Sequence, residues 1–400
     1  MLELADVVRR HGSAYLQTHG ASVLPSQVRA LDAIAQCRTA AMGGHLALCS
    51  ACGREHVLYH SCRNRACPRC GFDATNRWLA KQRELLLPVP YFHVVFTLPE
   101  ELRRIVRSHQ KALLSVLFRA AFDSLRSLCA DQHFLGAEEI GALAVLHTWT
   151  RTLEWHPHVH MLVPGGGLAA DGQTWLSVPP RSKRYLVPEK ALAKHFRGRF
   201  LALARRALPN VSFPEIPWGK RWVVFAKPVM HGSERVLQYL GRYVHRTALS
   251  GKALLDCDEH TVTFRYRRSS DHQSRSMTLP AQEFLRRFLQ HVPPKGFHRV
   301  RAFGLLHPEH RGTLRRLQLL LAPRESSKPT TPEPSSPDAP ISTSPDGPTC
   351  PHCGRPALSP VRRLSAEECI KRETLAANGV IGTARAPPLS RSQGQRDVRP

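Results

Sequence analysis

The chain has 400 residues, of which 42% are hydrophobic and 22% are charged, enough for two packed domains and an additional tail. Lysine and arginine total 57 against 31 acidic residues, a formal net charge of +26 that attracts polyanions and predicts nucleic acid as the partner. An anionic membrane and a solvated basic surface are the alternatives. No apolar run approaches the roughly 18 residues that span a bilayer, and the acidic N-terminus is unlike a signal peptide, so we expect a cytoplasmic, nucleoid-associated protein.

Residues 1–86 are predicted to form a helical and zinc-binding module. Apolar spacing indicates two helices within 1–36, and a third helix is expected over 73–87. Between them, from Cys37 to about Gly71, the chain breaks into short pieces that are too small for an apolar core. Six of the eleven cysteines fall in this segment. In a cytoplasmic chain they are better interpreted as metal ligands or free thiols than as disulfides.

Two CxxC pairs in this module have the spacing of a zinc ribbon, in which two knuckles together close a tetrahedral thiolate site. Gly53 and Gly71 follow the pairs where such a knuckle needs a positive φ. We therefore predict a structural Zn²⁺, with the ligands Cys49, Cys52, Cys67 and Cys70. A second zinc remains an open alternative, and its ligands would come from Cys37, His45, His60 and Cys62.

Residues 87–322 are predicted to form an α+β catalytic domain. Runs of β-branched and aromatic residues indicate strands over 91–99, 141–149, 156–166, 221–229, 261–267, 275–280 and 298–306. Helical apolar spacing indicates helices over 100–130, 189–207, 233–246, 282–292 and 309–321. This irregular alternation favours a largely antiparallel central sheet flanked by helices.

The segment EWHPHVHML carries the sharpest catalytic signal in the sequence. Alternate side chains of a β-strand share a face, so four polar residues are expected to point the same way. They are Glu154, His156, His158 and His160. Several imidazoles on one face would be left unsatisfied without a metal, and Mg²⁺, Mn²⁺ or even Zn²⁺ suits such nitrogen and oxygen ligands. Pro157 cannot donate a ladder hydrogen bond, which predicts an edge strand or the very start of a strand.

A predicted helix near residue 240 carries two phenols. Tyr239 and Tyr243 are four residues apart and lie together on the flank of its apolar stripe. Three arginines lie just beyond them and are expected to contact DNA phosphates: Arg235, Arg242 and Arg246. A phenol beside an arginine row suits phosphoryl transfer, although boundary tyrosines that merely pack would look the same.

The segment 323–400 begins as a Pro/Ser/Thr-rich stretch that is too polar to bury a core, and we predict that it is a disordered tail. Within it, Cys350-Pro-His-Cys353 is half of a zinc knuckle, which Cys369 could join. No fourth cysteine follows, so a remnant or a weak site is expected there. Cys129 and Cys257 are expected to be core thiols.

The order of these motifs resembles the HUH rolling-circle transposases of the insertion-sequence ninety-one family, over roughly residues 15–322. HUH denotes His, hydrophobic, His, here His158-Val159-His160 within EWHPHVHMLVPGGGL, and a cysteine module, FTLP and YLGRYVHRTALS stand in the family's order around it. Ala66 departs from the family pattern, in which a histidine is expected at this position, and this weakens the case for a second zinc.

The resemblance implies an HUH endonuclease domain behind an N-terminal zinc-binding domain. It further implies a catalytic Mg²⁺ or Mn²⁺ on His158 and His160, and tyrosine nucleophiles at Tyr239 and Tyr243. The expected activity is nicking and rejoining of single-stranded DNA at element ends and target through a 5′-phosphotyrosine. A plasmid or phage replication initiator would use the same chemistry, and a non-catalytic zinc-ribbon protein that binds nucleic acid is the alternative of a different class.

Overall fold

A computed structural model describes residues 2–178, 186–216, 219–229, 241, 247–250, 252–268, 271, 273–322 and 348–377. The chain divides into two compact units, one made of Met1–Leu31 with Asn64–Glu325 and the other of Asp32–Arg63 with Ser326–Pro400. This division differs from the predicted boundaries at residues 86 and 322, because Asp32–Arg63 and the C-terminal segment belong to one unit. Helices mixed with antiparallel sheets confirm the predicted α+β class.

The larger unit begins with the two predicted helices, α1 (Leu4–His19) and α2 (Pro25–Ala35), joined by the 3-10 helix η1 (Gly20–Ser22). A capping box at Glu3 and Asp6 starts α1, which packs on α8 (Ala281–Leu289). Helix α3 (Pro68–Arg83) starts five residues before its predicted position. Cys67 is its N-cap and Pro68 its first residue, where a fixed proline φ favours the helical turn.

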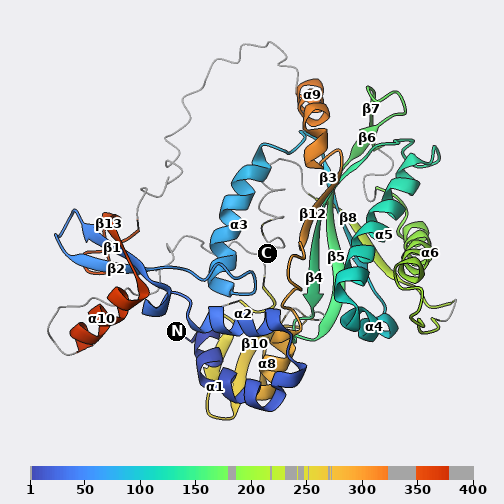
Figure 1. The fold of residues 1–400 in the computed structure, drawn as a ribbon. Helices are drawn as coiled ribbons and strands as arrows, with labels where there is room; N and C mark the ends of the chain where they lie inside the picture. The colour runs from blue at the N-terminus through green and yellow to red at the C-terminus, as the bar shows by residue number, and fades with distance from the viewer. Residues whose placement is uncertain are drawn as a thin grey trace, which may run out of the picture. The chain divides into compact units, whose positions relative to one another are not determined.

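The centre of the larger unit is a five-stranded antiparallel sheet in the order β12-β4-β5-β3-β8 (Figure 1). Its strands are β3 (Tyr91–Thr97), β4 (Gly141–Trp149), β5 (Trp155–Pro164), β8 (Val223–Val229) and β12 (Val300–Gly304). All five fall where β-branched and aromatic runs predicted strands.

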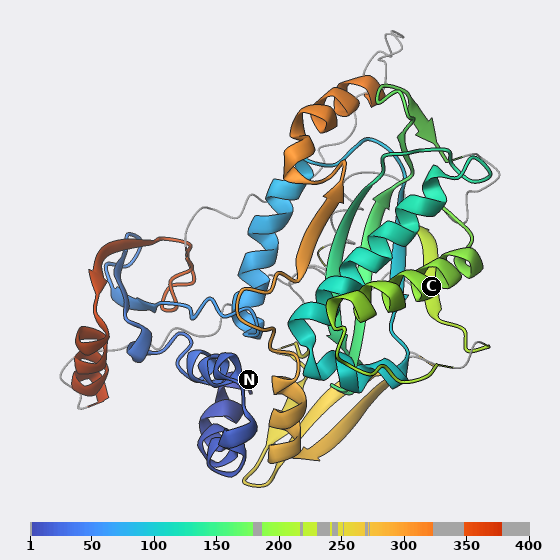
Figure 2. The ribbon, with the colours of Figure 1, turned by 45° about the vertical axis from the view of Figure 1, so that its right-hand side comes forward.

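Helices α5 (Gln110–Ala130) and α6 (Glu189–Ala207) cover one face of this sheet (Figure 2). Alternation along the strands turns Phe96 and Met161 into that core, where Phe96 and Phe196 stack edge to face with their centroids 5.0 Å apart. The opposite face carries a smaller cluster around Tyr91 and Leu162, against which Trp78 of α3 packs. One part of this second face is polar and carries the candidate site described below.

Strand β5 lies inside the sheet, so the prediction of an edge strand is wrong. Pro157 is its third residue, and the alternative prediction of a strand start fits better. The β4–β5 register shifts between His147 and Trp149, opposite the segment that contains Pro157. The ladder hydrogen bonds are interrupted at this bulge, so the N–H that proline lacks is not needed there.

The remaining elements of the larger unit frame the central sheet. A three-stranded antiparallel sheet, β9 (Leu254–Cys257), β10 (Thr261–Arg267) and β11 (Ser274–Pro280), packs on α8 through Phe264 and Phe284. A hairpin joins β6 (Gly166–Leu168) to β7 (Trp175–Ser177). The short helices are η3 (Glu100–Leu102), α4 (Arg103–Ser108) and η5 (Pro308–His310), and α9 (Arg311–Leu321) buries Leu314 and Leu317.

The smaller unit is a three-stranded antiparallel sheet in the order β13-β1-β2, with one helix and a 3-10 turn. Its elements are η2 (Ala40–Met42), β1 (Gly44–Cys49), β2 (Glu55–Tyr59), β13 (Leu358–Leu364) and α10 (Ala366–Ala377). The predicted tail therefore contains a strand and a helix over 348–377, where the sequence analysis expected disorder. Leu358 and Leu364 are buried at the two ends of β13 and anchor that strand.

Among the helices that the structure describes, none combines the length and apolar character needed to cross a lipid bilayer.

Candidate functional site

Three histidines from adjacent strands converge on the polar part of the second sheet face. His147 on β4 lies directly opposite His158 on β5, and His160 is two residues further along β5 on the same face. One ring nitrogen of each residue lies within 4.8 Å of the others. His147 is buried, while His158 and His160 are half-buried and can reach a ligand from solvent. Three imidazole nitrogens at this separation fit a single divalent metal ion.

Hydrogen bonds orient the two β5 imidazoles. The Nδ1 atom of His158 lies 2.7 Å from the carbonyl oxygen of His156, and a carbonyl can only accept, so His158 donates from Nδ1. The Nε2 lone pair of His158 is then available for a metal. His160 Nδ1 lies 2.9 Å from Nε2 of the buried His93 on β3, and the two rings stack with their centroids 5.1 Å apart. Donation from His160 to His93 would orient His160 in the same way.

Burial keeps His93 and His158 in the neutral imidazole form. Burial, with a smaller contribution from Lys227 and His158, lowers the pKa of His93 to about 3. Burial likewise lowers the pKa of His158 to about 4, although its hydrogen bond to the His156 carbonyl opposes the shift. A metal ligand must be a neutral imidazole, so burial removes the competition between proton and metal at neutral pH.

The structure does not bring Glu154 or His156 into this group. Glu154 is exposed in the turn before β5, where its backbone N–H donates to Thr150 Oγ1 at 3.1 Å. Arg103 donates to His156 Nδ1 at 2.8 Å, and burial and this guanidinium lower the pKa of His156 to about 4. His156 is therefore engaged by Arg103, and Glu154 lies in the turn outside the histidine group.

His147 is the site residue that the sequence analysis missed. It is a single histidine in the apolar run GALAVLHTW, which reads as an ordinary buried strand. The one sequence signal was its position in the two-residue alternation of the strand, because a residue of β4 that pairs with His158 must lie on the same side of the sheet. That signal requires the antiparallel register of the two strands, which the sequence does not contain.

The neighbouring strand β8 adds basic and aromatic side chains to the same face. Lys227 lies opposite His93, and Phe225 lies opposite Val95, in the register of β3 and β8. Phe225 is 47% exposed, and the Lys227 ammonium lies 6.0 Å from its ring centroid. An exposed ring beside a cation is a surface on which nucleotide bases can stack.

The predicted nucleophiles and phosphate contacts lie outside the described residues. This applies to Tyr239, Tyr243, Arg235, Arg242 and Arg246.

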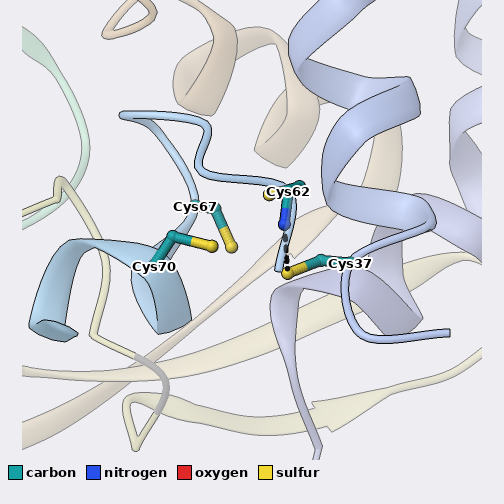
Figure 3. Close-up of side chains that lie close together, drawn as sticks. All are labelled: Cys37, Cys62, Cys67 and Cys70. Atoms are coloured by element: carbon teal, nitrogen blue, oxygen red, sulfur yellow. Dashed lines mark hydrogen bonds between the residues drawn. The ribbon is translucent and has the colours of Figure 1, made fainter. Parts of the chain in front are cut away.

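The cysteines form two groups that differ from the predicted one. The four sulfur atoms of Cys37, Cys62, Cys67 and Cys70 lie within 4.8 Å of one another (Figure 3), and the Cys62 backbone N–H donates to Cys37 Sγ at 3.5 Å. The second group, with the same mutual spacing, is Cys49, Cys52, Cys350 and Cys353. The zinc predicted on Cys49, Cys52, Cys67 and Cys70 is thus corrected. The reason is that β13 brings a second CxxC pair beside Cys49 and Cys52 from the far end of the chain.

The two other residues of the predicted second zinc set bind each other. His60 Nε2 lies 3.0 Å from His45 Nδ1, and His60 Nδ1 lies 3.2 Å from the Met42 carbonyl oxygen. Gly53 has the predicted positive φ of 72°, whereas Gly71 lies inside α3 and needs none.

Comparison with protein families gives two matches. Residues 7–98 match a family described as "Transposase zinc-binding domain", and residues 141–313 match one described as "Putative transposase". The chain is 43% identical over 329 residues to "Putative transposase y4qJ" of Sinorhizobium fredii, which covers 77% of this chain and 81% of that protein. It is 31% identical over 307 residues to "Transposase for insertion sequence element IS801" of Pseudomonas savastanoi pv. phaseolicola, with 70% of each covered. No solved structure matches.

These matches and the fold define a transposase with an N-terminal zinc-binding domain, and the cysteine groups support structural Zn²⁺. The chain belongs to the insertion-sequence ninety-one family.

Proposed function

We propose that this transposase nicks and rejoins single-stranded DNA at the ends of its element and at the target, through a 5′-phosphotyrosine intermediate, in rolling-circle transposition. The observation that carries the proposal is the histidine group on β4 and β5, three imidazoles converging on a half-buried, solvent-reachable face of a sheet. Structural imidazoles need no such convergence, whereas metal-assisted phosphoryl transfer does.

The donor set bears on which ion this site would hold. Three imidazole nitrogens without a carboxylate suit Mn²⁺ or Zn²⁺ better than Mg²⁺, which prefers oxygen ligands. Mg²⁺ remains compatible if phosphate and water oxygens complete its coordination. A bound ion would polarise the scissile phosphate and offset the negative charge that develops on it.

The remaining steps fall to side chains of the chain itself. The phenol oxygen of Tyr239 or Tyr243 attacks phosphorus and loses its proton, the bond from phosphorus to the 3′ oxygen breaks, and that strand leaves with a 3′-OH. The phosphotyrosine ester preserves the bond energy, so the 3′-OH of a second strand can displace the tyrosine without ATP. Arg235, Arg242 and Arg246 would hold the phosphates during both transfers.

DNA is the partner that the charge favours. A net charge of +26 attracts the phosphate backbone, and the exposed Phe225 beside Lys227 offers a base-stacking surface near the histidines. A chromosomal substrate would place the protein in the cytoplasm at the nucleoid.

A cleavage assay on labelled single-stranded DNA from the flanks of the gene tests this proposal. Wild type, Tyr239→Phe, Tyr243→Phe and the double variant are compared with Mn²⁺ or Mg²⁺, and the covalent adduct is followed in denaturing gels. Tyr266→Phe, on β10, is the matched control. We expect a metal-dependent adduct that the double variant loses and the control keeps. DNA binding without any adduct would instead indicate a non-catalytic zinc-ribbon protein.

A further inference from the structure

The smaller unit contains two knuckles of the same construction at opposite ends of the chain. Both have the sequence Cys-x-x-Cys-Gly-Arg, starting at Cys49 and at Cys350. Gly53 has a φ of 72° and Gly354 a φ of 71°, and in neither case would a Cβ meet an atom within 4 Å. Glycine is thus retained for its backbone conformation, which tight knuckles require.

The hydrogen bonds of the two knuckles also correspond. Gly53 N–H donates to the Cys49 carbonyl at 2.8 Å, and Gly354 N–H donates to the Cys350 carbonyl at 2.9 Å. The N–H of the first cysteine of each knuckle donates to the carbonyl of its arginine, Arg54 at 2.9 Å and Arg355 at 2.7 Å. Each knuckle therefore holds its two sulfur atoms by the same backbone turn.

Backbone N–H groups donate to the first sulfur in both turns. The donors are Ala51 and Cys52 at Cys49, and His352 and Cys353 at Cys350. Such N–H groups stabilise thiolate, the form that binds metal.

The two knuckles face each other. Cys49 Sγ lies 3.7 Å from Cys353 Sγ, and Cys52 Sγ lies 3.8 Å from Cys350 Sγ. All four are free thiols, and all four sulfur atoms lie within 4.8 Å of one another. The Nε2 atom of the buried His56 lies 3.2 Å from Cys350 Sγ. An N–H at this position can orient a ligand sulfur.

The described residues of the unit form a small apolar core. They make two clusters of four buried residues each, and one cluster consists of Ala47, Leu358 and two of the cysteines in question. The C-terminal strand β13 is joined to β1 by an antiparallel ladder that ends at the pair Cys49 and Leu358. A core of this size does not stabilise a small fold without a staple.

We infer that Cys49, Cys52, Cys350 and Cys353 bind one Zn²⁺, so that the zinc ribbon of this protein is closed by a knuckle from each end of the chain. Four thiolates in two facing knuckles select Zn²⁺ among the divalent ions. The zinc would hold segment 348–377 against the hairpin formed by β1 and β2. This inference does not rest on the proposed nicking chemistry.

Metal content of the full-length protein is the first test. Native mass spectrometry is run on wild type, on Cys350→Ser with Cys353→Ser, and on Cys369→Ala as the control, a buried cysteine of the same segment outside the group. We expect the double variant to lose one zinc per chain and the control to lose none. An unchanged zinc count, or a wild-type mass lower by the hydrogens of two disulfides with no metal, overturns the inference.

A second test keeps Cys49, Cys52, Cys350 and Cys353 intact, so its main comparison does not depend on how a variant of these ligands folds. A protease site is inserted between residues 326 and 346 of the full chain, which is then cut. The C-terminal fragment is expected to stay bound with zinc present and to be released by a chelator. Cys67→Ser with Cys70→Ser, which breaks only the other group, is expected to retain the fragment. Release of the fragment in the presence of zinc, or its retention after the metal is stripped, contradicts the inference that zinc holds the segment in place.

Discussion

The histidine and cysteine sites are built on opposite physical principles. The histidines project from a five-stranded sheet with a large apolar core, which holds them in place whether or not a metal is bound. The group of Cys49, Cys52, Cys350 and Cys353 lies in the smaller unit, whose described residues form two clusters of four buried residues each. A metal would thus have to supply much of the folding energy there. A metal would therefore have a catalytic role at the histidines and a structural role at the cysteines.

The largest expected effect tests the first half of this comparison. Replacing His158 and His160 by Ala should reduce metal-dependent strand cleavage by about 10³-fold or more, since the ion that stabilises the phosphate is no longer held. The thermal midpoint should change little, because both side chains are only half-buried. His133→Ala, at an exposed histidine, is the control. A folded double variant that cleaves at the wild-type rate would exclude the histidines from catalysis.

Stripping zinc tests the second half. We expect amide protons of β1, β2 and β13 to exchange far faster after chelation, while those of β3, β4 and β5 stay protected, and hydrogen exchange with mass spectrometry measures both. The apparent binding free energy of a structural zinc is about 10–16 kcal/mol, enough to account for the stability of a small unit. Equal loss of protection in the two sets of strands would show that the smaller unit depends on zinc no more than the central sheet does.

A smaller effect sharpens the assignment of the third histidine. His147→Ala should weaken Mn²⁺ binding by about 100-fold, measured by titration calorimetry, because one of three nitrogen ligands is removed. Glu154→Gln should leave the affinity unchanged, since Glu154 is exposed in the turn before β5 and lies outside the group. The reverse pattern would restore the assignment expected from the sequence.

The smallest effect concerns acid stability of the larger unit. His291 is fully buried between Thr148 Oγ1 and the Leu153 carbonyl, and burial lowers its pKa to about 3. The unfolded chain takes up the proton near pH 6.5, so stability is lost as the pH falls from there towards 3. One such group should cost about 2 kcal/mol between pH 7 and pH 5. Urea unfolding followed by tryptophan fluorescence should show a shallower pH dependence for His291→Gln, and identical slopes would contradict this account.

Local pattern was sufficient for much of this protein. Period-2 alternation predicted that Glu154, His156, His158 and His160 share one face. The buried positions between the three histidines fit this pattern, whereas Glu154 lies before the start of β5. The strands of the central sheet and the helices α1, α2, α5 and α6 follow from apolar spacing in the same way. These features depend on residues a few positions apart, whose relative placement backbone geometry alone determines.

Partners from distant segments were decided only by the tertiary structure. His147 joins His158 through the register of two strands, and Cys49 meets Cys353 across 304 residues because β13 pairs with β1. Every candidate ligand is present in the sequence, but the prediction grouped the cysteines by their proximity along the chain. What it determined by itself is the chemistry of each motif and its local conformation. Which motifs share a site was decided by strand order and register, since these depend on long-range packing that no short spacing encodes.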